Sequence, residues 1–332
     1  MKILALQLKR IGDTILTAPA LAALQQARPE VRITLAVHAS CAPLLEMIPA
    51  VRSGIVFGPG RGWTPWQQAL TGGFDAVLDF TGTDRSAAIC ALTRAPRRAT
   101  FAWVKKSRVR ALAYHHFVDS PVRDFHTAEH YRHLLRALDG LVADAGPEPA
   151  LAVSSALLAE AEALLPRRDC AVLHAGSARP EKYWRPERWA EVAAHLHRTH
   201  GLAVVLTGGK DPAEQEHLAA IRAALPGDCP ITDLSGRLSL GGFAATLARA
   251  RLVVSCDTAA VHFASAFQRP QVALFGPTNP FHWRPRHARA AVLSAAQPGA
   301  PLTACDPRMK GAPMERISTG LVIGAIESVL SS

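Results

Sequence analysis

Residues 253–285 read Val253-Val-Ser-Cys-Asp257-Thr258-Ala259-Ala260-Val-His262-Phe-Ala-Ser-Ala-Phe-Gln-Arg-Pro-Gln-Val-Ala-Leu-Phe-Gly276-Pro277-Thr278-Asn-Pro-Phe-His-Trp283-Arg284-Pro285. The apolar runs 252–255 and 271–275 predict two short buried strands. Between them, Asp257-Thr258 is an N-cap signal for a helix that ends near Phe267. Parallel strands in this order form a crevice at their carboxyl ends, where a helix N-terminus favours an anion. The polar residues expected to face it are Asp257, Thr258, His262 and Thr278.

The alternation of strands and helices extends over all 332 residues, enough for two α/β domains. In the first half we expect strands at 2–8, 31–37, 54–57, 74–80 and 98–102, and helices at 11–27, 41–47, 63–70, 84–93 and 125–138. Residues 105–116 are poorly patterned. Residues 144–149 have linker composition, which places the domain boundary between 148 and 149. The second half repeats the pattern, with strands at 170–174, 202–207 and 231–233, helices at 185–200, 213–224 and 242–249, and a closing helix at 317–330.

Three motifs carry a resemblance to a known family. They are Gly12-Asp13-Thr14-Ile-Leu-Thr-Ala-Pro-Ala-Leu21, His174-Ala-Gly-Ser177-Ala-Arg-Pro-Glu-Lys182-Tyr-Trp184, and Asp257-Thr-x-x-x-His262 followed by Ala-Leu-Phe-Gly-Pro-Thr-Asn-Pro. Together they resemble the ADP-heptose:lipopolysaccharide heptosyltransferases of glycosyltransferase family 9. The resemblance implies the α/β GT-B fold, in which two Rossmann-like domains face a central cleft. It implies an acceptor-binding domain at 1–148 and a nucleotide-sugar-binding domain at 149–332, whose last helix packs back on the first domain.

Dinucleotide and P-loop binding are poorly supported. No Gly-x-Gly-x-x-Gly follows the first strand, and Gly208-Gly209-Lys210 lacks the Walker spacing.

Asp13 follows the first strand at the start of a helix, where open α/β sheets place functional groups. Position alone favours a helix-capping aspartate, because Asp is a preferred N-cap residue. The resemblance instead implies that Asp13 is the catalytic base, which takes the proton of the acceptor hydroxyl.

The resemblance also implies a site for the nucleotide-sugar donor. Lys182 and Ser177 lie in the loop that would bind the diphosphate, and a lysine acts there as a point charge. The amides of Thr258, Ala259 and Ala260 at a helix start would complete the anion site. The other residues expected around the donor are Asp257, His262, Thr278 and Glu214, with Glu216 as the competing alignment for Glu214. Trp184 and Trp189 are expected in the core.

One position departs from the family pattern: Ala259 stands where glycine is commoner, and its Cβ would narrow the pocket. Ala259, together with Trp283-Arg284-Pro285, resembles the pattern of the branch that adds the third inner-core heptose.

Basic residues concentrate in one part of a chain whose net charge is +10. Residues 85–136 hold eleven Lys and Arg against three acids, a local excess of +8. Such a patch indicates an anionic partner, here the lipopolysaccharide core through Arg85 and Ser86, or an anionic membrane surface. A solvated charged face explains the excess equally well. No apolar anchor is evident.

Cellular location follows from the cysteines and the termini. Six cysteines without a Cys-x-x-Cys pair, no signal peptide and no apolar run of spanning length predict a cytoplasmic protein, either soluble or peripheral. The resemblance to lipopolysaccharide enzymes implies that the peripheral location would be the inner face of the inner membrane.

We expect no cofactor. His126, His130 and His133 have zinc-like spacing, but no carboxylate or cysteine completes the set, so we expect no metal there. The absence of an Asp-x-Asp pair fits metal-independent, inverting transfer. Two rivals to the transferase are a non-catalytic bilobed sugar-nucleotide or lipopolysaccharide-binding protein, and a nucleic-acid-binding protein. Intact Asp13 and Lys182 disfavour the first, and the lack of interleaved aromatics disfavours the second.

Overall fold

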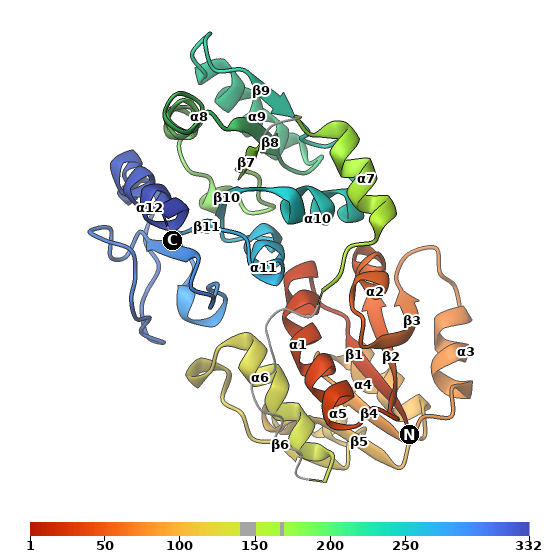
Figure 1. The fold of residues 1–332 in the computed structure, drawn as a ribbon. Coiled ribbons are helices and arrows are strands. Elements are labelled where there is room, and N and C mark those ends of the chain that lie inside the picture. Colours follow the sequence, from red (N-terminus) through yellow and green to blue (C-terminus); the bar gives the residue numbers. More distant parts are fainter. Residues whose placement is uncertain (140–150, 167–168, 332) are drawn as a thin grey trace. The chain divides into compact units, whose positions relative to one another are not determined.

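A computed structural model describes residues 1–139, 151–166 and 169–331 (Figure 1). The chain divides into two compact units, Met1–Ala152 and Val153–Ser332. The domain boundary predicted between residues 148 and 149 lies outside the described residues.

Unit 1 is built on a six-stranded parallel sheet of order β3-β2-β1-β4-β5-β6. Its strands are β1 (Lys2–Gln7), β2 (Arg32–His38), β3 (Val51–Phe57), β4 (Ala76–Asp79), β5 (Arg97–Phe101) and β6 (His116–Val118). Its helices are α1 (Ile11–Ala27), α2 (Leu44–Met47), α3 (Thr64–Thr71), α4 (Asp84–Leu92), α5 (Arg108–Ala111) and α6 (Thr127–His133), with 3-10 turns η1 (Ala39–Cys41), η2 (Ala102–Lys106), η3 (Val122–Asp124) and η4 (Leu134–Ala137). Ile3 to Leu6 of β1 are fully buried, as expected for a central strand covered on both faces.

Unit 2 contains a second parallel sheet, of order β12-β11-β10-β7-β8-β9. Its strands are β7 (Cys170–His174), β8 (Ala203–Thr207), β9 (Ile231–Asp233), β10 (Leu252–Cys256), β11 (Gln271–Phe275) and β12 (Ala290–Ser294). Its helices are α7 (Ser155–Leu164), α8 (Pro186–His200), α9 (Pro212–Ala224), α10 (Leu240–Arg249), α11 (Ala259–Ala266) and α12 (Thr319–Ser331), with 3-10 turns η5 (Pro180–Lys182), η6 (Pro280–His282) and η7 (Met314–Arg316). Helix α8 packs on α9 and α12, and α10 packs on α7 and α11.

Both sheets have the same topology. Numbered within its own unit, each sheet has the strand order 3-2-1-4-5-6 of a Rossmann fold. The first and fourth strands of each unit are therefore neighbours, and the chain leaves them in opposite directions. At this switch point the loops after the two strands separate, and doubly wound folds bind ligands there.

The predicted core aromatics are confirmed in unit 2. Trp184 and Trp189 are fully buried and meet edge to face, with ring centroids 5.3 Å apart. The Trp184 indole N–H donates to the carbonyl of Ile317 at 2.9 Å, which satisfies the polar end of the ring.

The secondary structure differs from the prediction in several places. The expected helix 125–138 is α6 followed by the 3-10 turn η4, and residues 105–116 hold the short helix α5. Helix α7 and strands β6 and β12 are absent from the prediction. Helix α12 packs against α8, β11 and β12 of its own unit, and its return to the first domain stays a prediction.

Candidate functional site

The predicted site residues of unit 1 lie at the switch point of its sheet. Asp13 follows β1, and Arg85 and Ser86 follow β4, which pairs directly with β1. In unit 2, Ser177 and Lys182 follow β7, whereas Asp257 and Thr258 follow its neighbour β10. Each set of residues is thus brought to the carboxyl edge of adjacent parallel strands by the topology alone.

Asp13 does not cap helix α1. The N-cap position is Arg10, which makes no side-chain cap bond, and Asp13 is the third residue of the helix. The capping explanation for this aspartate is therefore wrong. Its Oδ1 accepts a 2.6 Å hydrogen bond from the hydroxyl of Tyr131, and the residue remains partly exposed. The bond fixes the carboxylate and leaves Oδ2 available to a ligand.

Tyr131 is the functional neighbour that sequence analysis missed. It lies on α6, is 2% exposed, and packs edge to face against Phe80. Burial, followed by the charge of Asp13, raises the pKa of the Tyr131 hydroxyl well above 10, so the hydroxyl stays protonated and donates. Tyr131 lies 118 positions from Asp13 in the sequence, so nothing within the first motif indicates their contact.

A buried carboxylate shapes the loop that carries Arg85. Asp79 ends β4 with no exposed surface, and its Oδ1 accepts the amides of Thr81 and Gly82 at 2.8 and 3.1 Å. Its Oδ2 accepts the Tyr114 hydroxyl, and burial raises the pKa of Asp79. Gly82 adopts φ +67°, in the region that favours glycine.

Arg85 and Ser86 have different surroundings. Arg85 is exposed at the start of α4. Ser86 is fully buried, and its Oγ accepts the Thr83 amide at 2.9 Å within a capping box. Ser86 therefore serves the helix start, and direct contact with an acceptor stays a prediction that the geometry favours only for Arg85.

Lys182 and Asp257 form a buried ion pair in unit 2. The Lys182 ammonium donates to Asp257 Oδ2 at 2.6 Å and to the Asp257 carbonyl at 2.7 Å, with side chains 12% and 9% exposed. These bonds use two of the three N–H donors of the lysine, so one remains for an anion. The pair joins the loops after β7 and β10 across the switch point.

Helix α11 begins directly after this pair. Thr258 is its N-cap, with extended backbone, and its hydroxyl accepts the Ala260 amide at 3.3 Å. The Ala260 amide is bonded to the cap hydroxyl in this structure, and its place in an anion site stays a prediction. The amides of Thr258 and Ala259 remain as candidates. His262 is buried one turn further along the helix.

Glu214 is enclosed by three glycines. It is 6% exposed on α9, and its Oε1 accepts the Gly209 amide. A Cβ at Gly176 would lie 1.7 Å from Glu214 Oε1, and Cβ atoms at Gly208 and Gly209 would lie 3.0 and 2.8 Å from its carboxylate oxygens. A side chain at these positions would require the Glu214 carboxylate to move, and burial raises the pKa of this carboxylate. The competing Glu216 is exposed.

Two hydroxyls complete the predicted donor set. Ser177 is 8% exposed, and its Oγ accepts the Arg179 amide at 3.1 Å. The Thr278 hydroxyl, in the loop after β11, is buried and has no hydrogen-bond partner. A buried hydroxyl without a partner costs roughly 1–3 kcal/mol, so a ligand that supplies one is favoured.

Lowering the pH should destabilise unit 2 through His174. Burial lowers its pKa from 6.5 to about 4, and its Nδ1 lies 3.0 Å from Thr207 Oγ1. Because the unfolded chain takes up this proton at the higher pH, the free energy of unfolding falls as pH drops from about 6.5 towards 4, by up to about 3 kcal/mol. Urea denaturation of wild type and His174→Asn measures this; an equal loss in both would contradict the assignment.

The histidines with zinc-like spacing have other partners. His126 caps α6 by accepting the Ala128 amide at 3.3 Å, and His130 and His133 each place Nδ1 2.9 Å from the Ser120 hydroxyl. Within the described residues, potential metal ligands converge in unit 2 instead, at His195, His200 and Glu327. None of the helices in the described ranges is both long and apolar enough to cross a bilayer.

A family model matches most of this chain. Residues 63–310 match the family model of glycosyltransferase family 9 (heptosyltransferase). A similar curated protein is lipopolysaccharide heptosyltransferase 1 of Pseudomonas aeruginosa, 29% identical over 84% of this chain and 80% of that protein.

Solved structures share the fold. The family 9 glycosyltransferase of Veillonella parvula has a TM-score of 0.85 at 24% identity, covering 99% of this chain and 97% of that one. Escherichia coli heptosyltransferase WaaC with ADP-2-deoxy-2-fluoro heptose has a TM-score of 0.74 at 23% identity, with 99% of each chain covered. The predicted α/β GT-B fold, with two Rossmann-like units, is confirmed.

Proposed function

Because this chain belongs to glycosyltransferase family 9, we propose that it moves a heptose from ADP-heptose to a hydroxyl of the lipopolysaccharide core. The observation that carries the proposal is the pair of switch points. One holds a positioned carboxylate, Asp13, and the other holds an ammonium beside a helix N-terminus. A base for the acceptor and a cationic site for a leaving diphosphate are the two groups that such a transfer needs.

The proposed reaction is a single displacement. The acceptor oxygen attacks the anomeric carbon as its proton passes to Asp13 Oδ2. The bond between that carbon and the diphosphate oxygen breaks, and ADP leaves with the electron pair. Attack from the face opposite the leaving group inverts the anomeric configuration, and no step needs a metal or another cofactor.

We assign donor binding to unit 2. The free N–H of Lys182 and the amides of Thr258 and Ala259 would hold the diphosphate. The Thr278 hydroxyl would gain its missing partner from the nucleoside, and Glu214 would accept hydroxyls of the ribose or sugar. Ser177, Asp257 and His262 would complete the pocket. We assign acceptor binding to unit 1, where Arg85 lies at the start of α4.

The branch of the family stays a prediction. The motif Asp257-Thr258-Ala259 with Trp283-Arg284-Pro285 favours the addition of the third inner-core heptose. The rival function, a non-catalytic binding protein, requires that Asp13 be dispensable, although the structure orients its carboxylate through Tyr131.

Mass spectrometry of lipopolysaccharide from cells with and without the gene tests the function. We expect the truncated core to lack a heptose and all sugars added after it. An unchanged core mass would overturn the proposal. Incubating the purified chain with ADP-heptose and the truncated core should restore the missing mass.

We further propose that unit 1 docks on the anionic inner face of the inner membrane through residues 105–112. Val109 and Leu112 are 80% and 83% exposed, which is unusual for large aliphatic side chains. Lys105, Lys106 and Arg108 beside them are also exposed. Apolar side chains among cations match a bilayer with anionic headgroups, where each cation contributes about 1 kcal/mol.

An ion pair joins the segment to the rest of the unit. The Arg110 guanidinium forms a two-pronged ion pair with Asp84, at 2.6 and 3.2 Å, which ties α5 to the start of α4. This contact lies beside Arg85, the residue assigned to the acceptor. A membrane-bound acceptor would thus contact Arg85 next to the segment that contacts the lipid.

The double variant Val109→Ser/Leu112→Ser should lower binding to anionic vesicles by at least about 10-fold, because each buried aliphatic side chain contributes roughly 1.5–3 kcal/mol. High salt should weaken binding of the wild type, since surface charges are screened. Flotation with anionic and neutral vesicles measures both effects. Leu70→Ser, at a 39% exposed position on α3, is the control. Binding that ignores both salt and the double variant would exclude this segment.

A further inference from the structure

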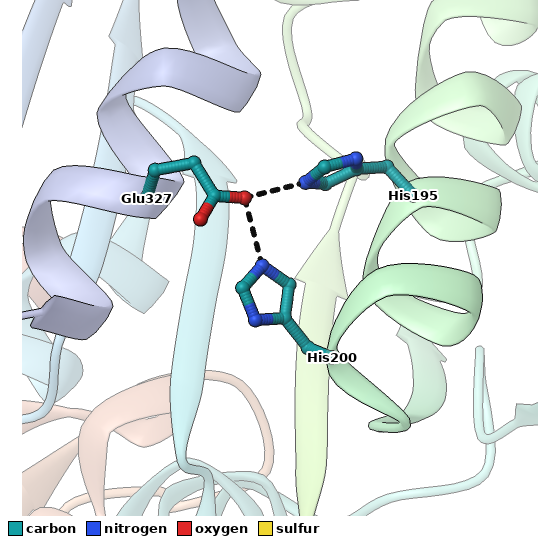
Figure 2. Close-up of side chains that lie close together, drawn as sticks. All are labelled: His195, His200 and Glu327. Carbon is teal, nitrogen blue, oxygen red and sulfur yellow. Dashed lines mark hydrogen bonds and ion pairs between the residues drawn. The ribbon is translucent and has the colours of Figure 1, made fainter.

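Two histidines and a glutamate converge on one point in unit 2 (Figure 2). His195 lies on α8, His200 is its last residue, and Glu327 comes from α12. We propose that these three side chains bind a divalent transition cation, with zinc preferred.

The geometry requires little change to hold the ion. Glu327 Oε1 lies 2.7 Å from His195 Nε2 and 2.8 Å from His200 Nε2, and the ligand atoms all lie within 4.8 Å of one another. Zinc binds imidazole nitrogen and carboxylate oxygen at about 2.0–2.2 Å, so tetrahedral ligands stand about 3.4 Å apart. Side-chain movements of less than about 1 Å would bring the distances between the three ligand atoms to that value.

The local fold also favours a cation at this place. Helix α8 ends at His200, and Gly201 closes it in the left-handed conformation, so the carbonyl end of the helix dipole lies at the cluster. His195 Nδ1 has a hydroxyl, that of Thr199, at 3.4 Å, an outer partner of the kind that orients metal-bound histidines.

There is space for water ligands. His200 and Glu327 line an open recess of about 560 Å³ together with Asp169, Leu202 and Arg251. The three ligand side chains are 20%, 21% and 46% exposed, so the ion can reach them from solvent. Two imidazoles and one carboxylate leave at least one coordination position for water.

The cluster is separate from the transfer chemistry. Helix α8 ends just before β8, and Asp169 and Arg251 precede β7 and β10. The recess therefore lies at the edge where the strands begin, opposite the carboxyl edge that carries Lys182 and Asp257. A bound ion would join α12 to α8 and stabilise the unit without touching the proposed substrates.

Without a metal, the same residues are joined by hydrogen bonds, and the bonds from His195 and His200 lower the pKa of Glu327. Metal titration separates this alternative from the proposal. Calorimetry on the full chain without an affinity tag should show one zinc ion bound. Zinc at about 100 times its dissociation constant should raise Tm by roughly 5 °C. Magnesium and calcium should not compete, because they prefer oxygen ligands.

His195→Ala and the near-isosteric Glu327→Gln should each weaken zinc binding by more than the roughly 10–100-fold that loss of an outer partner costs. His116→Ala, an exposed histidine on β6, is the matched control and should bind as wild type does. Cobalt should give a visible spectrum of nitrogen and oxygen coordination. Thiolate bands, or zinc affinity unchanged in Glu327→Gln, would overturn the assignment.

Discussion

Asp13→Asn should reduce turnover by about 10²–10⁴-fold, the usual contribution of a positioned general base. A sugar hydroxyl attacks the anomeric carbon only as its proton leaves, and an amide cannot take up that proton. Single-turnover kinetics with ADP-heptose and a truncated core acceptor measure the loss. ADP affinity should stay nearly unchanged, because the donor is assigned to unit 2.

The variant should remain folded. Asparagine keeps an acceptor for the Tyr131 hydroxyl, which now bonds Oδ1 at 2.6 Å. Removing a negative charge from the first turn of α1 costs about 0.3–1 kcal/mol through the helix dipole. Since Asp13 is not the N-cap, no capping bond is lost.

Tyr131→Phe is the matched control for Asp13. It removes the hydrogen bond that orients the carboxylate but leaves the base in place, so its loss of turnover should be smaller than that of Asp13→Asn. Normal turnover in Asp13→Asn would remove Asp13 as the base and leave the transfer without an identified base. Normal turnover in Tyr131→Phe would show only that Asp13 needs no orientation by the tyrosine.

The fold was predictable because the central parallel strands, such as β1, β4, β7, β10 and β11, are buried on both faces and read as short apolar runs. The starts of helices α8 and α9 were also predictable, because Pro186 and Pro212 stand at their first positions. Helix α7 was missed although Ser154 is its N-cap and Leu157, Ala161 and Leu164 follow helical spacing, a signal that was present in the sequence. Strand β12 is a short edge strand of small residues within an irregular stretch.

The site was predictable only where a motif is local. The positions of Asp13, Lys182 and Asp257 follow from the strand ends that precede them. Their partners do not, because the Asp13–Tyr131 bond spans 118 residues and the Lys182–Asp257 pair spans 75. Contacts of this range depend on strand order, which no short stretch of sequence encodes.

Lys182→Met should weaken ADP binding by about 10- to 150-fold, because the diphosphate loses a charge-assisted hydrogen bond of ~1.5–3 kcal/mol. The same change should also lower the free energy of unfolding by about 3–5 kcal/mol. Its cause is separate: the Asp257 carboxylate, 9% exposed, would be left buried without its cation. Calorimetric titration with ADP and urea denaturation measure the two effects.

The double variant Lys182→Met/Asp257→Asn separates the effect on ADP binding from the effect on the free energy of unfolding. With both charges removed, no buried ion remains unpaired, so most of the lost stability should return. ADP affinity should not return, because the cation for the diphosphate is still missing. Arg179→Met is the control on the same loop: its ion pair with Glu181 is about half exposed, and its loss should cost less than about 1 kcal/mol. If the double variant regained ADP affinity together with stability, Lys182 would be a structural partner of Asp257 and the diphosphate would need another cation.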